Sequence, residues 1–561
     1  MKIKTTLINP QQIFSKGQIA AGLTPPLGIA YLASFLLAHE YPVQVIDALG
    51  EDPSEINPFK KGSYLRGIKV SEIVRKIDDD TDLVAISNLF SFAYPIVEVL
   101  CQEIRKAYPE KKIVLGGPHP SALYDEILKN VPAVDFVAIG EGEESLLGLL
   151  EHLGGRLDLN ELSGLAARDK SGDIIVLKSS KRIKNLNKEN IPFPARHLLP
   201  MENYIQAQEG HGPSSGRWTS ILSSRGCPYG CTFCESRRTA WIARTPKDVV
   251  DEMEHCLKEW GINEFHFEDD NMTINKERLI GICDEIISRK LKIKWQTPNG
   301  IRASVTDSEM LTKMKESGCL HITLAPETGS ERVLNEIIEK GKDFNLSQLK
   351  DCGALAHSLG LKVAAYFIIG LPGETRNEVE ETIKYAKELA KCGVDEVAFG
   401  LFIPLPGTPL WDIAKKKNQQ MDFLDLLAVG DMNKAVSWND DISAEELNSL
   451  RLKAYLTFHS TRMFYHPLLF INSFLNVLRS INETKTERTL IQFLKRLRIR
   501  KKTTNGELKI KTVEMGLTAY PYDSSLTIKT LLQSKPHYSY GHSLLKTLRI
   551  WKNKTFNLKK S

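Results

Sequence analysis

The chain is poor in cysteine and has no long apolar run. Only nine of its 561 residues are cysteines, too few and too scattered for the disulfide framework of a small secreted protein, so reduced thiols or metal ligands are expected. No uninterrupted apolar stretch reaches the roughly 18 residues of a membrane-spanning helix, and the start MKIKTTLINP has no apolar signal segment. These absences predict a cytoplasmic protein without membrane spans.

The overall composition is that of a folded soluble protein, with 42% hydrophobic and 25% charged residues, which excludes disordered, collagen-like and multi-span membrane chains. The net charge of +5 hides an imbalance, because residues 441–561 contain 22 Lys and Arg against 8 Asp and Glu. This basic end predicts an anionic partner, either a membrane surface or nucleic acid. The alternative is a solvated basic helical tail.

The first 150 residues alternate between short β-branched runs and helical stretches. Such alternation predicts an α/β fold with a doubly wound parallel sheet, and ligands bind such sheets outside the carboxyl ends of their strands. The strand candidates are KTTLINP, VQVID, DLVAIS, KKIVLGGPH and FVAIGEGEE. The candidate binding loops are Asn9-Pro10, Ser87-Asn88, Gly116 to His119 and Gly140 to Glu143.

The alternation returns after residue 218, with six strand candidates up to about residue 426. Six βα units form a partial barrel, whose chemistry lies at the carboxyl ends of the strands. Between the two blocks, LAARDKSGDIIVLK predicts a hairpin in a linker, and after Asp440 the pattern becomes helical. The expected organisation is a doubly wound domain (1–155), a linker with a hairpin (156–214), a (βα)6 partial barrel (215–430) and a mainly helical, basic region (431–561).

Three cysteines stand together in SSRGCPYGCTFCESRR, directly after the first strand of the second block: Cys227, Cys231 and Cys234. A structural zinc site normally needs four ligands, and no second Cys-x2-Cys pair exists in the chain. Three thiolates instead favour a 4Fe-4S cluster with one iron left open. The alternative of incidental loop cysteines is disfavoured by their spacing and by the flanking Gly226 and Gly230.

The spacing Cys-x3-Cys-x-aromatic-Cys, with Phe233 as the aromatic residue, resembles the radical S-adenosylmethionine (SAM) superfamily. The resemblance implies that the cysteines bind three irons and that SAM chelates the fourth. Reduction of the cluster then cleaves SAM to a 5′-deoxyadenosyl radical.

Later segments match the same superfamily in the expected order, namely FHFEDDN, LAPETGS and FIIGLPGET. For the first of them the alternative is a solvated acidic turn. The resemblance implies that SAM is contacted by Phe233, Glu268, Asp270, Glu327, Thr328, Gly370 and Gly373. Outside this site, Cys256 and Cys283 follow helical apolar spacing and are expected in the core.

The N-terminal block resembles the cobalamin-binding domain that precedes the barrel in one subgroup of the superfamily, through TPPLGIAYLASFLLAHEYPVQVIDA, LGGPHPS and VAIGEGEESL. The implied cobalamin contacts are Ser87, Asn88, Gly116, Gly117, His119, Gly140 and Glu141. The first loop, NPQQIFSKGQ, lacks the histidine that ligates cobalt in many cobalamin proteins, and His119 is expected as a cofactor contact or a loop-capping group. A dinucleotide is disfavoured because no GxGxxG follows the first strand.

The segment from Thr461 to Ser480 is rich in Phe and Leu, is interrupted by Pro467, and is followed by the basic run KRLRIRKK at residues 495–502. An amphipathic stretch beside a basic run predicts peripheral contact with an anionic membrane. The alternative is a set of helices packed on the barrel. No nucleic-acid-binding module is recognisable, so no nucleic-acid partner is expected.

Together these features predict a cobalamin-dependent radical SAM methyltransferase that acts on an unactivated carbon of a small-molecule or lipid-like substrate. Its substrate site would lie between the two domains, and a flavodoxin or ferredoxin would supply electrons. Cyclisation, ring contraction or oxidation by the same radical is the alternative, and a non-catalytic cobalamin or redox sensor is a third interpretation. A methylthiotransferase is disfavoured because only Cys101 precedes Cys227.

Overall fold

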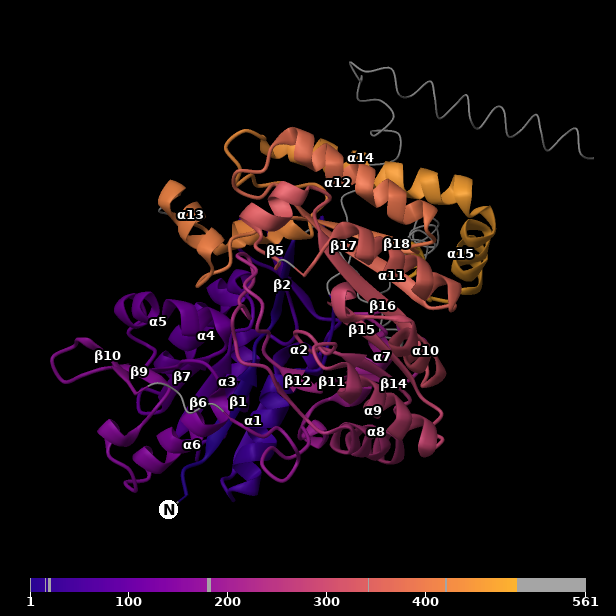
Figure 1. Cartoon of the computed structure of the whole chain (residues 1–561). Helices are drawn as coiled ribbons and strands as arrows, with labels where there is room; N and C mark the ends of the chain where they lie inside the picture. Colours follow the sequence, from indigo (N-terminus) through magenta and orange to yellow (C-terminus); the bar gives the residue numbers. More distant parts are fainter. Residues whose placement is uncertain are drawn as a thin grey trace, which may run out of the picture. The chain divides into compact units, whose positions relative to one another are not determined.

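A computed structural model of the chain describes residues 2–15, 17–18, 22–178, 183–341, 343–418 and 421–491. Its two large sheets correspond to the two alternating blocks of the sequence (Figure 1). The predicted α/β class, with a doubly wound sheet ahead of a partial barrel, is therefore confirmed.

The N-terminal sheet has five parallel strands in the order β3-β1-β6-β7-β8. The chain reverses its direction of winding between β1 and β6, and this switch point is where open α/β sheets bind ligands. Helices cover both faces of the sheet, and successive residues of one strand point to opposite faces. Leu7 of β1 packs with α1 and α6, whereas Ile8 packs with α3, α4 and α5. The strands are β1 (Thr5–Asn9), β3 (Val43–Asp47), β6 (Leu83–Ser87), β7 (Lys112–Gly116) and β8 (Phe136–Ala138). The helices are α1 (Leu27–Ala38), α3 (Val70–Lys76), α4 (Tyr94–Ala107), α5 (Pro118–Asn130) and α6 (Gly142–Leu153).

The predicted hairpin is present as β9 (Leu165–Arg168) and β10 (Ile174–Leu177). It is not a free part of a linker, however, because β9 pairs antiparallel with β8 and extends the N-terminal sheet. The reason is burial, since Leu165, Ala166 and Ala167 all lie in the core. The connection to the barrel is thereby reduced to the segment after the hairpin.

A small sheet was not predicted. The strands β2 (Gln12–Ser15), β5 (Ser63–Arg66) and β4 (Ile56–Pro58) form an antiparallel layer in that order. Sequence analysis read the first of these segments as a loop. Strands of three or four residues are too short to show a periodicity, and this layer is held by long-range burial of Ile13, Phe14 and Leu65.

The six predicted strands of the second block form one parallel sheet in sequence order. Phe265 and Phe267 pack outward against the helices, while the alternate residues Glu264 and His266 form a buried polar pair. The strands are β11 (Trp218–Ile221), β14 (Glu264–Phe267), β15 (Lys294–Ile301), β16 (Cys319–Glu327), β17 (Lys362–Ile369) and β18 (Glu396–Leu401). The helices are α8 (Pro246–Trp260), α9 (Lys276–Ser288), α10 (Ser308–Glu316), α11 (Leu346–Ser358) and α12 (Arg376–Lys391).

The C-terminal region is helical in its described part, with α13 (Pro409–Lys417), α14 (Ala444–Tyr465) and α15 (Pro467–Arg479). Helix α14 packs on α12, and Pro467 occupies the first turn of α15, where its missing N–H is not needed. The basic run 495–502 lies outside the described residues. Among the described helices, none is both long and apolar enough to cross a membrane.

Residues that follow α15 return to the barrel and close its amino end. The Arg488 guanidinium donates hydrogen bonds to the carbonyl oxygens of Gly210 and Gly212, at 2.7 and 3.0 Å. The backbone N–H of Thr486 donates to Glu396, the first residue of β18. The carboxyl end of the barrel is thus left for the chemistry.

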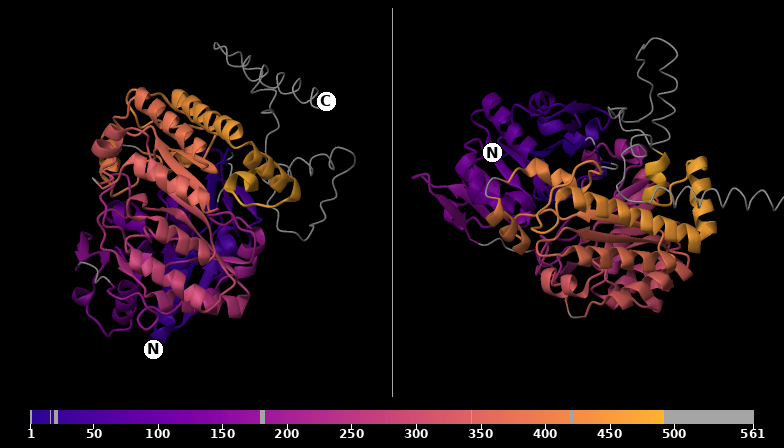
Figure 2. Two further views of the ribbon diagram at one scale, coloured as in Figure 1. Left: turned by 45° about the vertical axis from the view of Figure 1, so that its right-hand side comes forward. Right: turned by 90° about the horizontal axis from the view of Figure 1, so that it is seen from above.

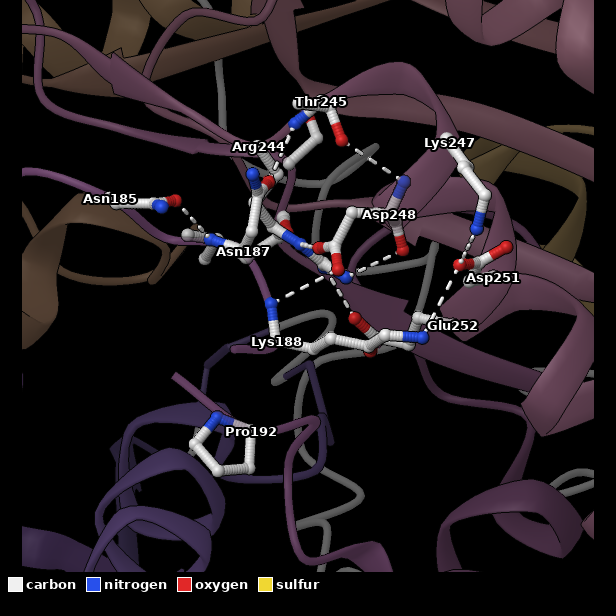
Figure 3. A network of polar contacts seen from close by, with 12 residues as sticks. Asn185, Asn187, Lys188, Pro192, Arg244, Thr245, Lys247, Asp248, Asp251 and Glu252 are labelled. Atoms are coloured by element: carbon white, nitrogen blue, oxygen red, sulfur yellow. Dashed lines mark hydrogen bonds and ion pairs between the residues drawn. The ribbon is translucent and has the colours of Figure 1, made fainter. Parts of the chain in front are cut away.

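Buried charges attach the connecting segment to α8 (Figure 3). The Lys188 backbone N–H donates to Asp248 at 3.0 Å, and Arg244 pairs with both Asp248 and Glu252. Arg196 of the same segment forms an ion pair of 2.7 Å with Glu252, and both side chains are fully buried. Two carboxylates therefore face two guanidinium groups inside the protein, and Glu252 is the one that contacts both arginines.

Replacement of that carboxylate tests this network. Because Glu252→Gln leaves two buried arginines without their shared counter-charge, we expect a loss of about 3 kcal/mol in the free energy of unfolding. Denaturant unfolding followed by tryptophan fluorescence measures it. Glu254→Gln on the same helix is the matched control and should change the stability little, because its partner Lys258 is exposed and its other partner, Arg289, keeps Asp251 and Glu285. Equal stability of the two variants would contradict the network.

Candidate active site

The cysteine loop is held by a short two-stranded ladder. Strands β12 (Ser224–Arg225) and β13 (Ile242–Ala243) pair antiparallel on either side of it. Within the loop, the N–H of Cys227 donates to Thr239 Oγ1 at 2.8 Å and the N–H of Thr239 donates to the Cys227 carbonyl at 2.9 Å. The loop is therefore a closed structure at the carboxyl end of β11.

The three thiols of this loop are free and partly buried. Burial raises the pKa of each thiol, that of Cys234 to about 12, so a bound cation is needed to hold them as thiolates. Among the described residues, no three His, Cys, Asp or Glu side chains converge closely enough for a single metal ion. Three free thiols on one loop fit an iron-sulfur core that leaves one iron open.

The acidic segment that follows β14 holds this loop in place. Asp270 accepts hydrogen bonds from the N–H of Gly226 at 2.9 Å and from Ser236 Oγ at 2.5 Å, which lie on opposite sides of the cysteines. Asp269 is buried against the hydroxyls of Ser223 and Ser224. Sequence analysis expected Asp270 to contact SAM, and the structure engages its carboxylate with the protein instead.

Glu268, the next expected SAM contact, lies at the end of β14. Its carboxylate is 3.0 Å from His211 Nδ1 and 3.5 Å from Ser220 Oγ. Burial alone would raise its pKa, but His211 and His266 outweigh burial and the pKa of Glu268 is lowered. The side chain is an ionised acceptor that could receive an ammonium group.

Glu327 and Thr328, at the end of β16, point in different directions. Glu327 has a positive φ of 65° and pairs at 2.7 Å with Lys340, which sequence analysis did not identify. Thr328 is fully buried, and its hydroxyl lies 3.0 Å from that of Thr382 on α12. The Thr328 hydroxyl thus faces a helix, and the contact of this residue with SAM stays a prediction.

The two glycines of FIIGLPGET have different surroundings. A Cβ on Gly370 would lie 2.7 Å from Leu447 of α14, so the packing of this helix requires glycine here. The expected contact of the Gly370 backbone with SAM stays a prediction. Gly373 has a φ of +76°, and a Cβ added there would lie 3.8 Å from Ile337, which is an ordinary contact distance. The turn is held by Glu374, whose Oε2 accepts from the N–H groups of Gly370 and Leu371 at 2.6 and 3.1 Å.

An apolar group that we call the mouth cluster lies at this end of the barrel. Phe233 and Cys231 of the cysteine loop pack against it, and so does Phe92, from the loop that follows β6 of the N-terminal sheet. Two loops from different domains therefore contact one apolar surface. The members of the mouth cluster are Val333, Ile338, Leu371, Phe402, Leu410, Ala414, Leu426 and Trp438.

The expected cobalamin contacts lie where parallel strands β6, β7 and β8 end. Gly117 has a φ of +116°, and a Cβ there would lie 2.5 Å from the Asn88 carbonyl oxygen, so only glycine fits. Asn88 is buried, and its Oδ1 has no partner among the described residues. Ser87 pairs with Gly116 in the sheet register. These four residues form one edge at which backbone is accessible.

The third strand end carries Gly140 and Glu141. Gly140 is exposed, with a φ of +83°, and its N–H donates to Ser121 Oγ at 3.1 Å. Glu141 accepts a hydrogen bond from the N–H of Ile183 at 2.9 Å and so holds the start of the connecting segment. Gly140 therefore remains open, whereas the Glu141 carboxylate is already engaged.

His119 is not at this edge. Its ring is 0% exposed, lies 4.5 Å from the Tyr94 ring and 4.8 Å from the Phe423 ring, and its Nδ1 is 2.9 Å from Ser91 Oγ. Burial lowers the pKa of His119 to about 3. This neutral histidine lies in the core beneath the loops, where its contact with Ser91 fits the alternative of a loop-capping group; the cofactor contact stays a prediction.

Two residues that sequence analysis missed do lie at this edge. Leu89 and Phe90 follow Asn88 directly and are 55% and 54% exposed. In the sequence, the presence of two large apolar residues in a polar strand-end loop was the feature that could have identified them. An exposed apolar pair near the exposed Gly140 fits a large flat macrocycle with a polar tail, such as cobalamin.

A second missed feature joins the two strand ends. Arg225, two residues before Cys227, forms an ion pair of 2.7 Å with Glu143, which follows β8. The Glu143 side chain is 4% exposed, and the Arg225 guanidinium lies over the Tyr31 ring at 5.3 Å. This buried pair links the cysteine loop directly to the N-terminal domain.

Comparisons with known proteins agree with this geometry. A family model described as the Radical SAM superfamily matches residues 221–386, and one described as the B12 binding domain matches residues 19–150. An uncharacterised methyltransferase of Pyrococcus horikoshii is 30% identical over 466 residues, which cover 82% of this chain and 93% of the relative.

A functionally named relative and a solved structure extend the comparison. Cytidylyl-2-hydroxyethylphosphonate methyltransferase of Streptomyces wedmorensis is 31% identical over 444 residues, 72% of this chain and 80% of the relative. The radical SAM methyltransferase TsrM of Kitasatospora setae, solved with cobalamin and a 4Fe-4S cluster, has a TM-score of 0.58 at 18% identity, over 74% of this chain and 75% of its own. This likeness shows a shared fold.

Asp270→Ala tests whether this carboxylate holds the loop or contacts SAM. If it holds the loop, iron should be lost to a chelator roughly 10- to 100-fold faster than from the wild type, as for other outer-shell ligands. Iron retained during anaerobic chelator challenge is the measurement. Asp284→Ala, at an exposed ion pair on α9, is the control. Unchanged iron release with weakened SAM binding would restore the sequence-based assignment.

Glu374 gives a prediction about pH. Burial raises its pKa to about 8 in the folded chain, whereas its ordinary value is 4.5. Between these values the folded state binds one more proton than the unfolded state, so stability falls as pH rises. Glu374→Gln has no proton to lose and should gain stability over the wild type between pH 5 and 8, by up to about 1.4 kcal/mol per pH unit.

Unfolding by denaturant at several pH values measures this difference. Glu378→Gln is the control, because Arg332 lowers the pKa of Glu378 to about 2 and its carboxylate is ionised in both states across that range. Its stability difference from the wild type should not change with pH. A Glu374→Gln difference that is equally flat would show that this carboxyl is ionised in the fold.

Proposed function

We propose that this chain transfers methyl groups to a carbon atom of a small molecule. The premise is that it belongs to the radical SAM superfamily, and within it to the members with a B12-binding domain. Its cofactors are a 4Fe-4S cluster, SAM and cobalamin. The transfer to an unactivated carbon is the part that the proposal adds.

One observation carries the proposal. Phe92, next to the cobalamin edge, and Phe233, within the cysteine loop, pack against the same mouth cluster, and Arg225 pairs with Glu143 beside it. A substrate carbon that reacts first with a radical and then with a methyl donor needs both cofactors to face the same substrate site. The contacts support a substrate site between the two strand ends, walled by apolar side chains that exclude water.

In the barrel, we assign the cluster to Cys227, Cys231 and Cys234. Glu268 is placed to accept hydrogen bonds from the methionyl amine of SAM and Glu327 from its ribose, while Gly373 leaves room for a flat ring. Asp270, Thr328 and Gly370 act by holding the loops that carry these groups. Bound here, the cluster and SAM supply the radical that removes a substrate hydrogen.

In the N-terminal domain, we assign the corrin face of cobalamin to Leu89 and Phe90. Gly116, Gly117 and Gly140 let the backbone approach the nucleotide tail, and Ser87 and Asn88 offer polar contacts. When bound, cobalamin supplies the methyl group. No residue is assigned as a lower cobalt ligand, because His119 is buried in the core.

Two relatives support methyl transfer, since the Pyrococcus and Streptomyces proteins are both named methyltransferases. Two others, named anaerobic magnesium-protoporphyrin IX monomethyl ester cyclases and 28% identical over 73% of this chain, support the alternative of cyclisation. The reducing electron is proposed to come from a flavodoxin or ferredoxin. Arg238, exposed on the cysteine loop, offers a positive charge to such an acidic partner.

The experiment measures cofactors first and products second. Protein purified without oxygen from cobalamin-supplied cells should contain about four irons and about one cobalamin per chain. With SAM and a reductant it should form both S-adenosylhomocysteine, which reports methyl donation, and 5′-deoxyadenosine, which reports the radical. 5′-Deoxyadenosine alone would favour cyclisation or oxidation, and neither product would favour a sensor.

Two variants separate the sites. Cys231→Ala should lose iron and 5′-deoxyadenosine, whereas Phe90→Asp should lose cobalamin and S-adenosylhomocysteine but keep its iron. Val176→Asp, at a similarly exposed apolar residue of the hairpin, is the control and should keep all four. Full cobalamin content in Phe90→Asp would refute the assigned corrin surface.

A further inference from the structure

Helix α15 has an unusual distribution of side chains. It has 13 residues, PLLFINSFLNVLR, and only Val477 is buried. Leu468, Ile471, Leu475 and Leu478 are spaced by three, four and three residues, so they lie along one face of the helix. This spacing is that of a helix with one apolar face.

The apolar face points away from the protein. Leu468 is 73% exposed, Phe474 58% and Leu478 57%. The side toward the protein is partly polar, since Asn476 donates a hydrogen bond to Glu487 at 3.1 Å. In a helix packed on a barrel the apolar stripe faces inward, so α15 is oriented the opposite way.

The exposed surface continues onto the end of α14. Phe464 is 79% exposed and Tyr465 51%, and they stand directly before the turn into α15. Figure 2 shows α14 and α15 in gold, joined at a sharp bend on the outer side of the barrel helices. The apolar residues of both helices form a patch larger than scattered surface leucines would give.

The charge of the neighbouring sequence identifies the partner. The run KRLRIRKK at residues 495–502 has six basic residues and no acidic one. It begins four positions after Ile491, the last described residue. Large apolar residues that are followed closely in the sequence by a cluster of Lys and Arg fit an anionic lipid bilayer, where apolar side chains enter the headgroup boundary and cations meet acidic headgroups.

We propose that α15 and the end of α14 dock this protein on the surface of an anionic membrane. The protein lies on the bilayer and does not span it, since α15 is a third shorter than a spanning helix. This inference is independent of the proposed methyl transfer. It replaces the alternative in which these helices only pack on the barrel.

The test is co-sedimentation of the anaerobically purified full chain with vesicles. The wild type should bind vesicles of phosphatidylglycerol and phosphatidylcholine, bind pure phosphatidylcholine more weakly, and lose binding as salt is raised. Phe474→Asp/Leu478→Asp should reduce the bound fraction roughly tenfold or more. Both residues are exposed, so unchanged iron content and circular dichroism will show that the variant folds.

A matched control changes two exposed apolar residues elsewhere. Val176→Asp/Ile413→Asp adds the same charge at residues 52% and 42% exposed and should bind like the wild type. Failure of the wild type to bind, or equal loss in both variants, would overturn the proposal. So would a dimer by light scattering that only Phe474→Asp/Leu478→Asp dissociates, because a second copy would then cover the face.

Discussion

The architecture depends on charges buried between segments that are far apart in sequence. Arg225 and Glu143 join the cysteine loop to the end of β8, and Glu252 balances Arg196 and Arg244 where the connecting segment crosses α8. A buried charge is costly unless its partner is in place. These pairs therefore favour one arrangement of the two α/β domains, the one in which both strand ends meet the mouth cluster. Packing of apolar surfaces alone would be less selective.

Acidic side chains also hold the loops of the candidate active site in place. Asp270 spans the cysteine loop, Glu374 shapes the turn after β17, and Lys340 neutralises Glu327. Asp270, Glu374 and Glu327 lie at or just beyond the carboxyl ends of barrel strands; Asp270 and Glu374 form hydrogen bonds with the loop backbone, and Glu327 pairs with a nearby side chain. Residues that touch a cofactor must be held by others that do not. Acidic strand-end residues thus divide into groups that hold loops and groups left to meet a ligand.

A membrane-docking surface would suit a substrate with apolar character. Helix α15 turns its apolar face outward although its sequence could equally pack inward, and the residues after it return to the amino end of the barrel. The docking surface is therefore formed by the region that closes the barrel opposite the cysteine loop. The proposed docking surface and the cysteine loop lie at different ends of the barrel, so either can be altered without the other.

The sequence by itself determined the fold class, the six barrel strands and the cysteine loop, because each is encoded locally, by alternating hydrophobicity or by fixed spacing. It also indicated Gly117, whose positive φ only glycine adopts without strain. Only the tertiary structure decided which polar residues remain free. Asp270, Thr328 and His119 match the motifs, yet their side chains are engaged by Gly226, Thr382 and Ser91. Those partners are between 28 and 54 residues away along the chain, and so are invisible to spacing. The exposure of Leu89, Phe90 and the apolar face of α15 could not be predicted from the sequence for the same reason, because exposure depends on how the whole molecule packs and not on the segment alone.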